Sequence, residues 1–375
     1  MTTSTEFIRE GKDLMGKLKF MEAEDRFKKA LQADSHSADA LVWLGKLALM
    51  KDQKEEGLRL IDQALTYHPH HAEALATKGI YYIQIADYQK AIDSLEEAKK
   101  ADPKLEMTYY NLGKAYRELG QFDQSEEALR KAIELNPKQY QAHSELSYIL
   151  GQTGRVAEGI REMVAAIKIN PLYLKGYLVL GALYKNAGKG ELVIDLYKEG
   201  LRNNPNAIPL REELCAMYML KMDLRAAYAE ALEIVKRRKN FYGDYLRLGN
   251  LAIANGEFET AEKAYKTSIQ LNPKSWEGHY NLGELYFSAK LMDQARAEYR
   301  AAIEHGPDQW KPFNGMGLFV LHADHNAEES IKYLTRALEL ASGQKEPLFN
   351  MALACSVGKD FANAEKFANS VLRLC

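Results

Sequence analysis

The chain has 375 residues, of which 46% are hydrophobic and 27% charged, and its formal net charge is −2. This balance argues against a nucleic-acid binder, whose affinity rests on neutralising phosphates, and no apolar run is long enough to span a membrane. The N-terminal segment lacks the apolar stretch of a secretory signal. Cys215, Cys355 and Cys375 are too few and too widely spaced for a disulfide framework. We therefore expect a cytoplasmic protein without direct membrane insertion.

Prolines mark a period along the chain. Their spacings are 34, 34, 34, 34, 68 and 34 residues, for Pro69, Pro103, Pro137, Pro171, Pro205, Pro273 and Pro307. Because 68 is twice 34, one repeat lacks its proline but keeps the register. A fixed period of this length is the signature of a repeat architecture.

Small residues keep the same phase. Each repeat has one in its first half: Gly11, Gly45, Gly79, Gly113, Ser147, Gly181, Cys215, Gly249, Gly283, Gly317 and Ala352. A large residue such as Tyr116 usually follows three positions later, and further small residues follow in the second half. These offsets are helical. Each repeat is therefore predicted to be two antiparallel helices whose backbones approach closely at the small residue, so Gly113→Leu should destabilise the chain by overpacking.

This pattern resembles the tetratricopeptide repeat (TPR) family, with a small residue at repeat position 8, an aromatic at 11, small residues at 20 and 27 and proline at 32. The segments 110–116 and 280–286 match it closely. The resemblance implies an all-α, right-handed superhelical solenoid of about eleven helix-turn-helix repeats, forming a single array over 1–375. In chain order the repeats are expected near 4–37, 38–71, 72–105, 106–139, 140–173, 174–207, 208–241, 242–275, 276–309, 310–344 and 345–375.

Several local features refine this expectation. Thr3 and Glu6 fit a capping box at the first helix, and one residue is inserted near 322–326. The asparagines before the repeat prolines, such as Asn136, are expected to adopt the left-handed conformation that ends a helix. The repeat at 208–241 is the weakest, because Arg211 stands where a large apolar residue is usual and its proline is missing. Its basic run 236–239 is interpreted as a solvated helix end.

Family members line an inner wall with the first helix of each repeat, at positions 2, 5, 6, 9, 12 and 13. The resemblance assigns peptide binding to the side chains at these positions, in which amides and aromatics could hold a bound segment. They are Trp43, Lys46, Ile80, Tyr110, Asn111, Lys114, Arg117, Tyr148, Asn250, Tyr280, Asn281, Lys311 and Asn350.

A carboxylate clamp, as in co-chaperones that grip a chaperone's C-terminal carboxylates, is a sharper hypothesis. Asn250, Asn281 and Lys311 match three of its five positions. Leu246 and Gly315 stand where the other two cations belong, and their loss weakens the electrostatic attraction.

The function expected from the sequence is a non-enzymatic scaffold or adaptor, which binds a peptide or helix of a partner protein in the concave groove. No catalytic residue, cofactor site or metal site is predicted. Three alternatives remain: a recruiting or regulatory subunit of a separate enzyme, a self-assembling structural component joined through the uncapped C-terminal helix, or an RNA binder like the related pentatricopeptide repeats. The last usually has a period of 35 residues and a basic surface, which this chain lacks.

Overall fold

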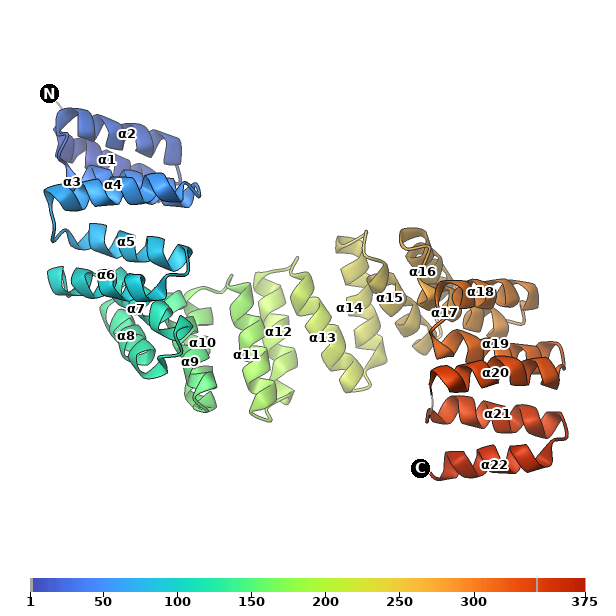
Figure 1. Cartoon of the computed structure of the whole chain (residues 1–375). Helices are drawn as coiled ribbons and strands as arrows, with labels where there is room; N and C mark the ends of the chain where they lie inside the picture. The colour runs from blue at the N-terminus through green and yellow to red at the C-terminus, as the bar shows by residue number, and fades with distance from the viewer. Residues whose placement is uncertain (1–2, 342, 375) are drawn as a thin grey trace. The chain divides into compact units, whose positions relative to one another are not determined.

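The computed structural model of the protein describes residues 3–341 and 343–374. Within these ranges the chain forms 22 α-helices and no strand. Consecutive helices pack as antiparallel pairs (Figure 1), so the predicted all-α repeat solenoid of eleven helix pairs is confirmed.

The helices group into two compact units, Met1–Asn204 and Pro205–Cys375. The first unit contains α1 (Ser4–Gly16), α2 (Phe20–Ala33), α3 (Ala38–Met50), α4 (Lys54–Tyr67), α5 (Ala72–Gln84), α6 (Tyr88–Ala101), α7 (Glu106–Glu118), α8 (Phe122–Leu135), α9 (Tyr140–Gln152), α10 (Val156–Ile169), α11 (Leu174–Asn186) and α12 (Glu191–Asn203). The second contains α13 (Ile208–Leu220), α14 (Leu224–Arg237), α15 (Tyr242–Ala254), α16 (Phe258–Leu271), α17 (Trp276–Ser288), α18 (Met292–His305), α19 (Trp310–Ala323), α20 (Ala327–Leu340), α21 (Lys345–Val357) and α22 (Phe361–Leu372). The single array over 1–375 stays a prediction.

Small residues set the distance between paired helices. The Ser125 hydroxyl of α8 donates to the carbonyl of Gly113 in α7 at 2.7 Å. Ser147 of α9 makes the equivalent bond to the Gly159 carbonyl at 2.7 Å. A hydroxyl reaches a backbone carbonyl across two helices only where no larger side chain separates them. The close approach predicted from the glycine series is therefore present in these pairs.

Helix starts follow local capping chemistry. The Thr3 hydroxyl accepts from the Glu6 backbone N–H, and the Glu6 carboxylate accepts from the Thr3 N–H, which confirms the predicted capping box. Helix α19 has 14 residues, whereas the other odd-numbered helices in the described chain have 13. This longer helix lies just before the predicted insertion.

The prediction of left-handed asparagines is wrong. Asn136 has a φ of −138° and Asn272 a φ of −139°, both extended. Their side-chain oxygens accept from the backbone N–H two residues later, at 3.1 and 3.3 Å, which makes the turn without a left-handed residue. The left-handed residue lies in the turn inside each pair instead, as at Gly120 and Met222.

The described helices are 12 to 14 residues long, and none of them is long and apolar enough to cross a membrane. Cys215 and Cys355 are buried in the packing between helices, and burial raises the pKa of both thiols. Cys375 lies outside the described residues.

Candidate functional site

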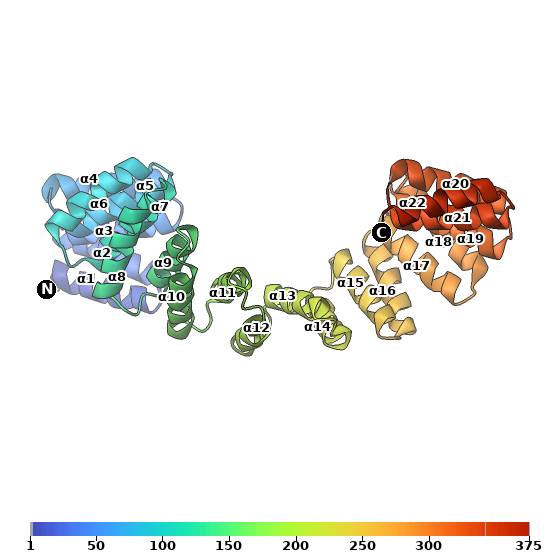
Figure 2. The ribbon, with the colours of Figure 1, turned by 90° about the horizontal axis from the view of Figure 1, so that it is seen from below.

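Successive odd-numbered helices contact one another from α3 to α9 in the first unit and from α15 to α21 in the second. Helix α5 contacts α3 and α7, and α17 contacts α15 and α19, as well as their own paired helices. Over the described residues, no two successive even-numbered helices of a unit are in comparable contact. Figure 2 shows the same helix pairs from below. The odd-numbered helices therefore crowd together on one side of each unit, where a shared surface can form.

A groove of about 430 Å³ lies on this face in the first unit, where α7, α9 and α11 meet. Arg117 of α7 crosses it and pairs with Glu145 of α9 at 2.8 Å. The Arg117 guanidinium also lies over the ring of Tyr148, 5.5 Å from the ring centre. Ser144 of α9 completes the floor through a 2.9 Å hydrogen bond to the Tyr173 hydroxyl. Arg117 and Tyr148, which the sequence assigned to separate repeats, thus meet in one groove.

Tyr110 and Lys114 lie beside each other on α7. The Lys114 amino group is 5.6 Å from the Tyr110 ring centre. Burial, with the nearby Glu145 carboxylate, raises the pKa of Tyr110 to about 12. The phenol therefore stays protonated and able to donate a hydrogen bond at neutral pH.

Trp43 and Lys46 form a second cluster, on α3. The Trp43 ring stacks on Phe27 at 5.6 Å and carries the Lys46 amino group 4.4 Å from its centre. Lys46 also pairs with Glu73 of α5 at 2.9 Å. The Trp43 indole nitrogen is buried without a hydrogen-bond partner in the described chain. Ile80 is half-buried further along, on α5.

The predicted amides differ in what they can offer a peptide. Asn111 is buried, and its side-chain nitrogen donates to the Met107 carbonyl of its own helix at 2.7 Å. Asn281 donates to the Asn250 side-chain oxygen at 3.1 Å. Asn250 is exposed, whereas Asn281 is half-buried. The central pair is therefore accessible, while Asn111 chiefly serves its own helix.

The remaining predicted residues lie in the second unit. Asn350 is 5% exposed and donates to Asn314 at 2.9 Å. Tyr280 is half-buried, and burial, followed by the nearby Glu284 carboxylate, raises the pKa of its phenol. Lys311 is exposed, with its amino group 5.8 Å from the Trp310 ring centre. The Glu284 and Glu346 carboxylates lie near Tyr280, and their negative charge is unfavourable for a clamp that must attract a carboxylate.

Arg211 has a structural role that the sequence pattern did not reveal. Its guanidinium pairs with Glu230 at 2.7 Å and donates to the Pro205 carbonyl at 3.2 Å. His143 and His279 make the same two kinds of contact in their own repeats, to Glu162 and Glu298 and to the proline carbonyls of the preceding turns. Arg211 thus replaces a buried apolar residue with a bridge from the helix pair to the turn before it.

The basic run 236–239 at the end of α14 forms ion pairs within the protein. Arg238 pairs with the buried Asp244 at 2.7 Å, and also with Glu212. Lys236 pairs with Glu233 at 2.7 Å. These contacts agree with the interpretation of the run as a helix end.

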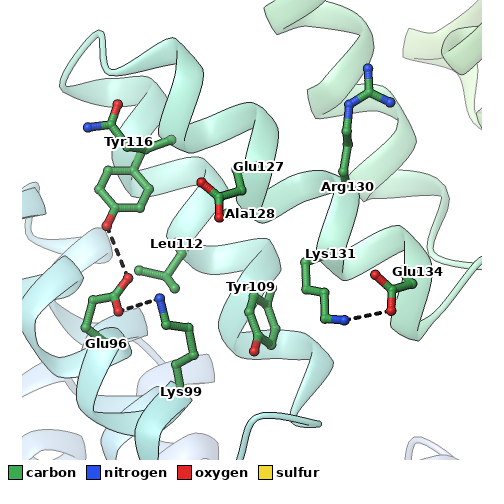
Figure 3. Close-up of a pocket in the computed structure, with 11 residues that line it drawn as sticks. Glu96, Lys99, Tyr109, Leu112, Tyr116, Glu127, Ala128, Arg130, Lys131 and Glu134 are labelled. Carbon is green, nitrogen blue, oxygen red and sulfur yellow. Dashed lines mark hydrogen bonds and ion pairs between the residues drawn. The ribbon is translucent and has the colours of Figure 1, made fainter.

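A second cavity, of about 560 Å³, lies between α6, α7 and α8, and the sequence did not predict it. Figure 3 shows the Tyr116 hydroxyl directed at Glu96, to which it donates at 3.2 Å, and Lys99 paired with the same carboxylate at 2.5 Å. Lys131 pairs with Glu134 at 2.6 Å on the opposite wall. Its charges largely compensate one another, so the cavity indicates no particular ligand.

Comparisons with known proteins place these repeats in a family. Models described as tetratricopeptide repeat match residues 18–81, 72–105, 107–139 and 246–309. No curated protein matches the chain in sequence.

Solved structures that resemble the chain are also TPR-like. PilF of Pseudomonas aeruginosa is 19% identical, with a TM-score of 0.49, and the match covers 56% of this chain and 95% of that one. Yeast Tom70 is 13% identical, with a TM-score of 0.43, covering 99% and 92%. YrrB, described as a TPR protein with an unusual peptide-binding site, is 22% identical, with a TM-score of 0.41, covering 49% and 95%.

The repeat matches and the helix pairs together identify the family. The chain belongs to the tetratricopeptide repeat family, whose repeats generally mediate protein–protein interaction.

Proposed function

We propose that this protein is a non-enzymatic, cytoplasmic adaptor that binds a peptide or helix of a partner protein along the face of its odd-numbered helices. The observation that carries the proposal is the groove where α7, α9 and α11 meet. Its Tyr148 side chain is 46% exposed. Exposed aromatics in a groove are the usual anchors of a peptide interface.

The test is an affinity capture from native lysate with wild type and a face variant, Tyr148→Ala in the groove of the first unit combined with Phe349→Ala on α21 of the second. Both side chains are exposed on odd-numbered helices, so their loss should leave the fold intact. The matched control, Met21→Ala with Phe258→Ala, removes two exposed apolar side chains from even-numbered helices.

We expect a partner protein that wild type and control retain and the face variant loses. Equal capture by all three proteins would move the binding site away from this face. Co-purification of an enzymatic activity would favour the recruiting-subunit alternative, and recovery of nucleic acid would contradict a protein partner.

Self-association through α22 is a second proposal. Phe361 is 67% exposed and Leu372 is 70% exposed, and none of the described residues of this helix is buried. An apolar helix face of this kind favours contact with another protein surface. Light scattering should show a mass that rises with concentration for wild type and stays monomeric for Phe361→Ser. A monomer at every concentration would contradict it.

A further inference from the structure

A carboxylate with unusual surroundings lies on the odd-helix face of the second unit. Glu284 of α17 is exposed to solvent, and its Oε1 accepts from the Tyr299 hydroxyl of α18 at 2.6 Å. Helix α19 closes in at Gly315. A Cβ at that position would lie 2.8 Å from Tyr299, 2.9 Å from Tyr280 and 3.1 Å from the Glu284 carboxylate. The glycine therefore lets two aromatic rings and the carboxylate pack against the helix backbone.

A second carboxylate is held on the same face. Glu346 of α21 accepts from the Asn314 side-chain nitrogen of α19 at 2.9 Å. The Asn314 oxygen in turn accepts from Asn350 at 2.9 Å. Asn314 is 1% exposed and Asn350 is 5% exposed, so a buried amide pair orients an exposed carboxylate.

The Glu346 carboxylate acts on Glu284 without a compensating cation among the described residues. The surrounding protein desolvates Glu284 and raises its pKa, and Glu346 raises it further. Within the described residues, neither Glu284 nor Glu346 forms an ion pair. Carboxylates on the same face of the first unit do have cationic partners: Glu145 pairs with Arg117, and Glu73 pairs with Lys46. A partly desolvated carboxylate that lacks a cationic partner lowers stability. Groups kept in that state are found preferentially where a ligand supplies the missing partner.

The numbers of charged residues on the odd-helix face also make the second unit the more acidic one. At repeat positions 2, 5, 6, 9, 12 and 13 the first unit has seven Lys or Arg and four Asp or Glu residues, whereas the second has two and five. The same face also carries exposed apolar side chains: on α21, Phe349 is 61% exposed and Val357 is 52% exposed. The chemistry offered to a partner is therefore acidic beside apolar.

We propose that the face of α17, α19 and α21 binds a basic and apolar peptide segment of a partner protein, with an Arg or Lys side chain at Glu284 and Glu346 and an apolar side chain on Phe349. The inference rests on the proposed adaptor function and adds the class of partner to it. A cation there gains two charge-assisted contacts and lies near the half-buried Tyr280 ring. An acidic or carboxylate-terminated segment is repelled.

The test uses random dodecapeptides displayed on phage and selected on the full-length protein. We expect the selected peptides to be enriched in Arg or Lys close to an apolar residue. A synthetic peptide of a selected sequence is then titrated by fluorescence anisotropy. Glu284→Gln with Glu346→Gln should weaken its binding at least about tenfold, since the variant removes the partners of a partly desolvated cation.

The matched control is Glu259→Gln with Glu365→Gln, which makes the same change in formal charge at two exposed carboxylates away from this face. It should bind within about twofold of wild type, because distant surface charges are screened. Thermal unfolding separates binding from folding. The Glu284 and Glu346 variant should melt no lower than wild type, since the raised pKa shows that the folded protein disfavours the charge.

Three outcomes overturn the inference. Selected peptides without basic residues, or equal binding by the double variant, contradict the assignment of the cation. Selected peptides that bind wild type but are lost only with Tyr148→Ala leave the adaptor function standing and remove this site. If wild type selects no peptide at all, the adaptor function fails and the inference fails with it.

Discussion

Single residues in this protein are constrained most tightly where paired helices approach each other. At Gly113 a Cβ would lie 2.6 Å from the Cγ of Leu129, which is itself fully buried. The neighbouring side chain therefore has little room to move. Helix propensity alone would favour a larger residue at this position, so packing rather than local preference selects glycine.

Gly113→Leu should lower the free energy of unfolding by about 1–3 kcal/mol through overpacking. Gly16→Leu is the control, because Gly16 also lies in a helix but no atom lies within 4 Å of its added Cβ. Denaturant unfolding followed by circular dichroism measures both. Equal destabilisation by the two variants would contradict the packing explanation.

His143 gives the first unit a pH-dependent contact. Its imidazole binds Glu162 at 2.7 Å, and this hydrogen bond raises the His143 pKa. The stabilisation is fully present below the ordinary imidazole pKa of about 6.5 and is lost as the pH rises through the raised value. His143→Leu should therefore cost on the order of 1 kcal/mol more at about pH 5.5 than at about pH 8.5.

Melting temperatures of wild type and variant across this range provide the measurement. Arg211→Leu removes the equivalent contact to Glu230, but a guanidinium stays protonated throughout. Its effect should not change with pH. If the loss of stability in His143→Leu stays constant or grows as the pH rises, the imidazole contributes as a neutral group.

At the scale of elements, the turn inside each helix pair imposes one left-handed residue. Gly120, Gly154, Gly188 and Gly256 fill it in four repeats. Met222 holds the same position with a φ of 59° and is 75% exposed, so its side chain gains little there. Non-glycine residues in this conformation cost about 1–2 kcal/mol.

Met222→Gly should raise the free energy of unfolding by roughly 0.5–1 kcal/mol, the conformational strain relieved less the entropy that glycine loses on folding. The reverse change, Gly256→Met, should destabilise its own turn by a similar amount. Thermal unfolding of the two variants checks both signs. A loss of stability in Met222→Gly would mean that the exposed methionine makes a contribution larger than the strain.

At the scale of the whole molecule, stability in a repeat array is carried by neighbouring repeats. A change in one unit should therefore have little effect on helices far along the chain. Native-state hydrogen exchange, read by mass spectrometry, should show weaker protection of α7 and α8 in Gly113→Leu and unchanged protection of α19 and α20. Gly317→Leu, whose added Cβ would lie 2.7 Å from Leu334, should give the converse. Loss of protection along the entire chain in either variant would indicate a single cooperative structure.

Much of the fold could be predicted because the same residue types recur at the same positions of successive repeats. The 34-residue spacing of prolines and small residues predicts the helix pairs, and Thr3 with Glu6 predicts the first cap. The turn chemistry could not be predicted as well, since asparagine suits both a left-handed residue and a side-chain turn. Asn136 takes the second role, and only its backbone angles distinguish the two.

The sequence by itself determined the all-α repeat fold and the helix that each candidate residue belongs to, because small residues and prolines act within one repeat and its neighbour. The tertiary structure decided which of these residues share a surface. No sequence pattern singled out Glu284, because its environment comes from Tyr299, Gly315 and Glu346 on three other helices. In the sequence, Arg211 is a departure from the repeat pattern. In the structure it pairs with Glu230 and donates to the Pro205 carbonyl. Charge and burial at a site depend on neighbours that are distant in sequence, and only packing brings them together.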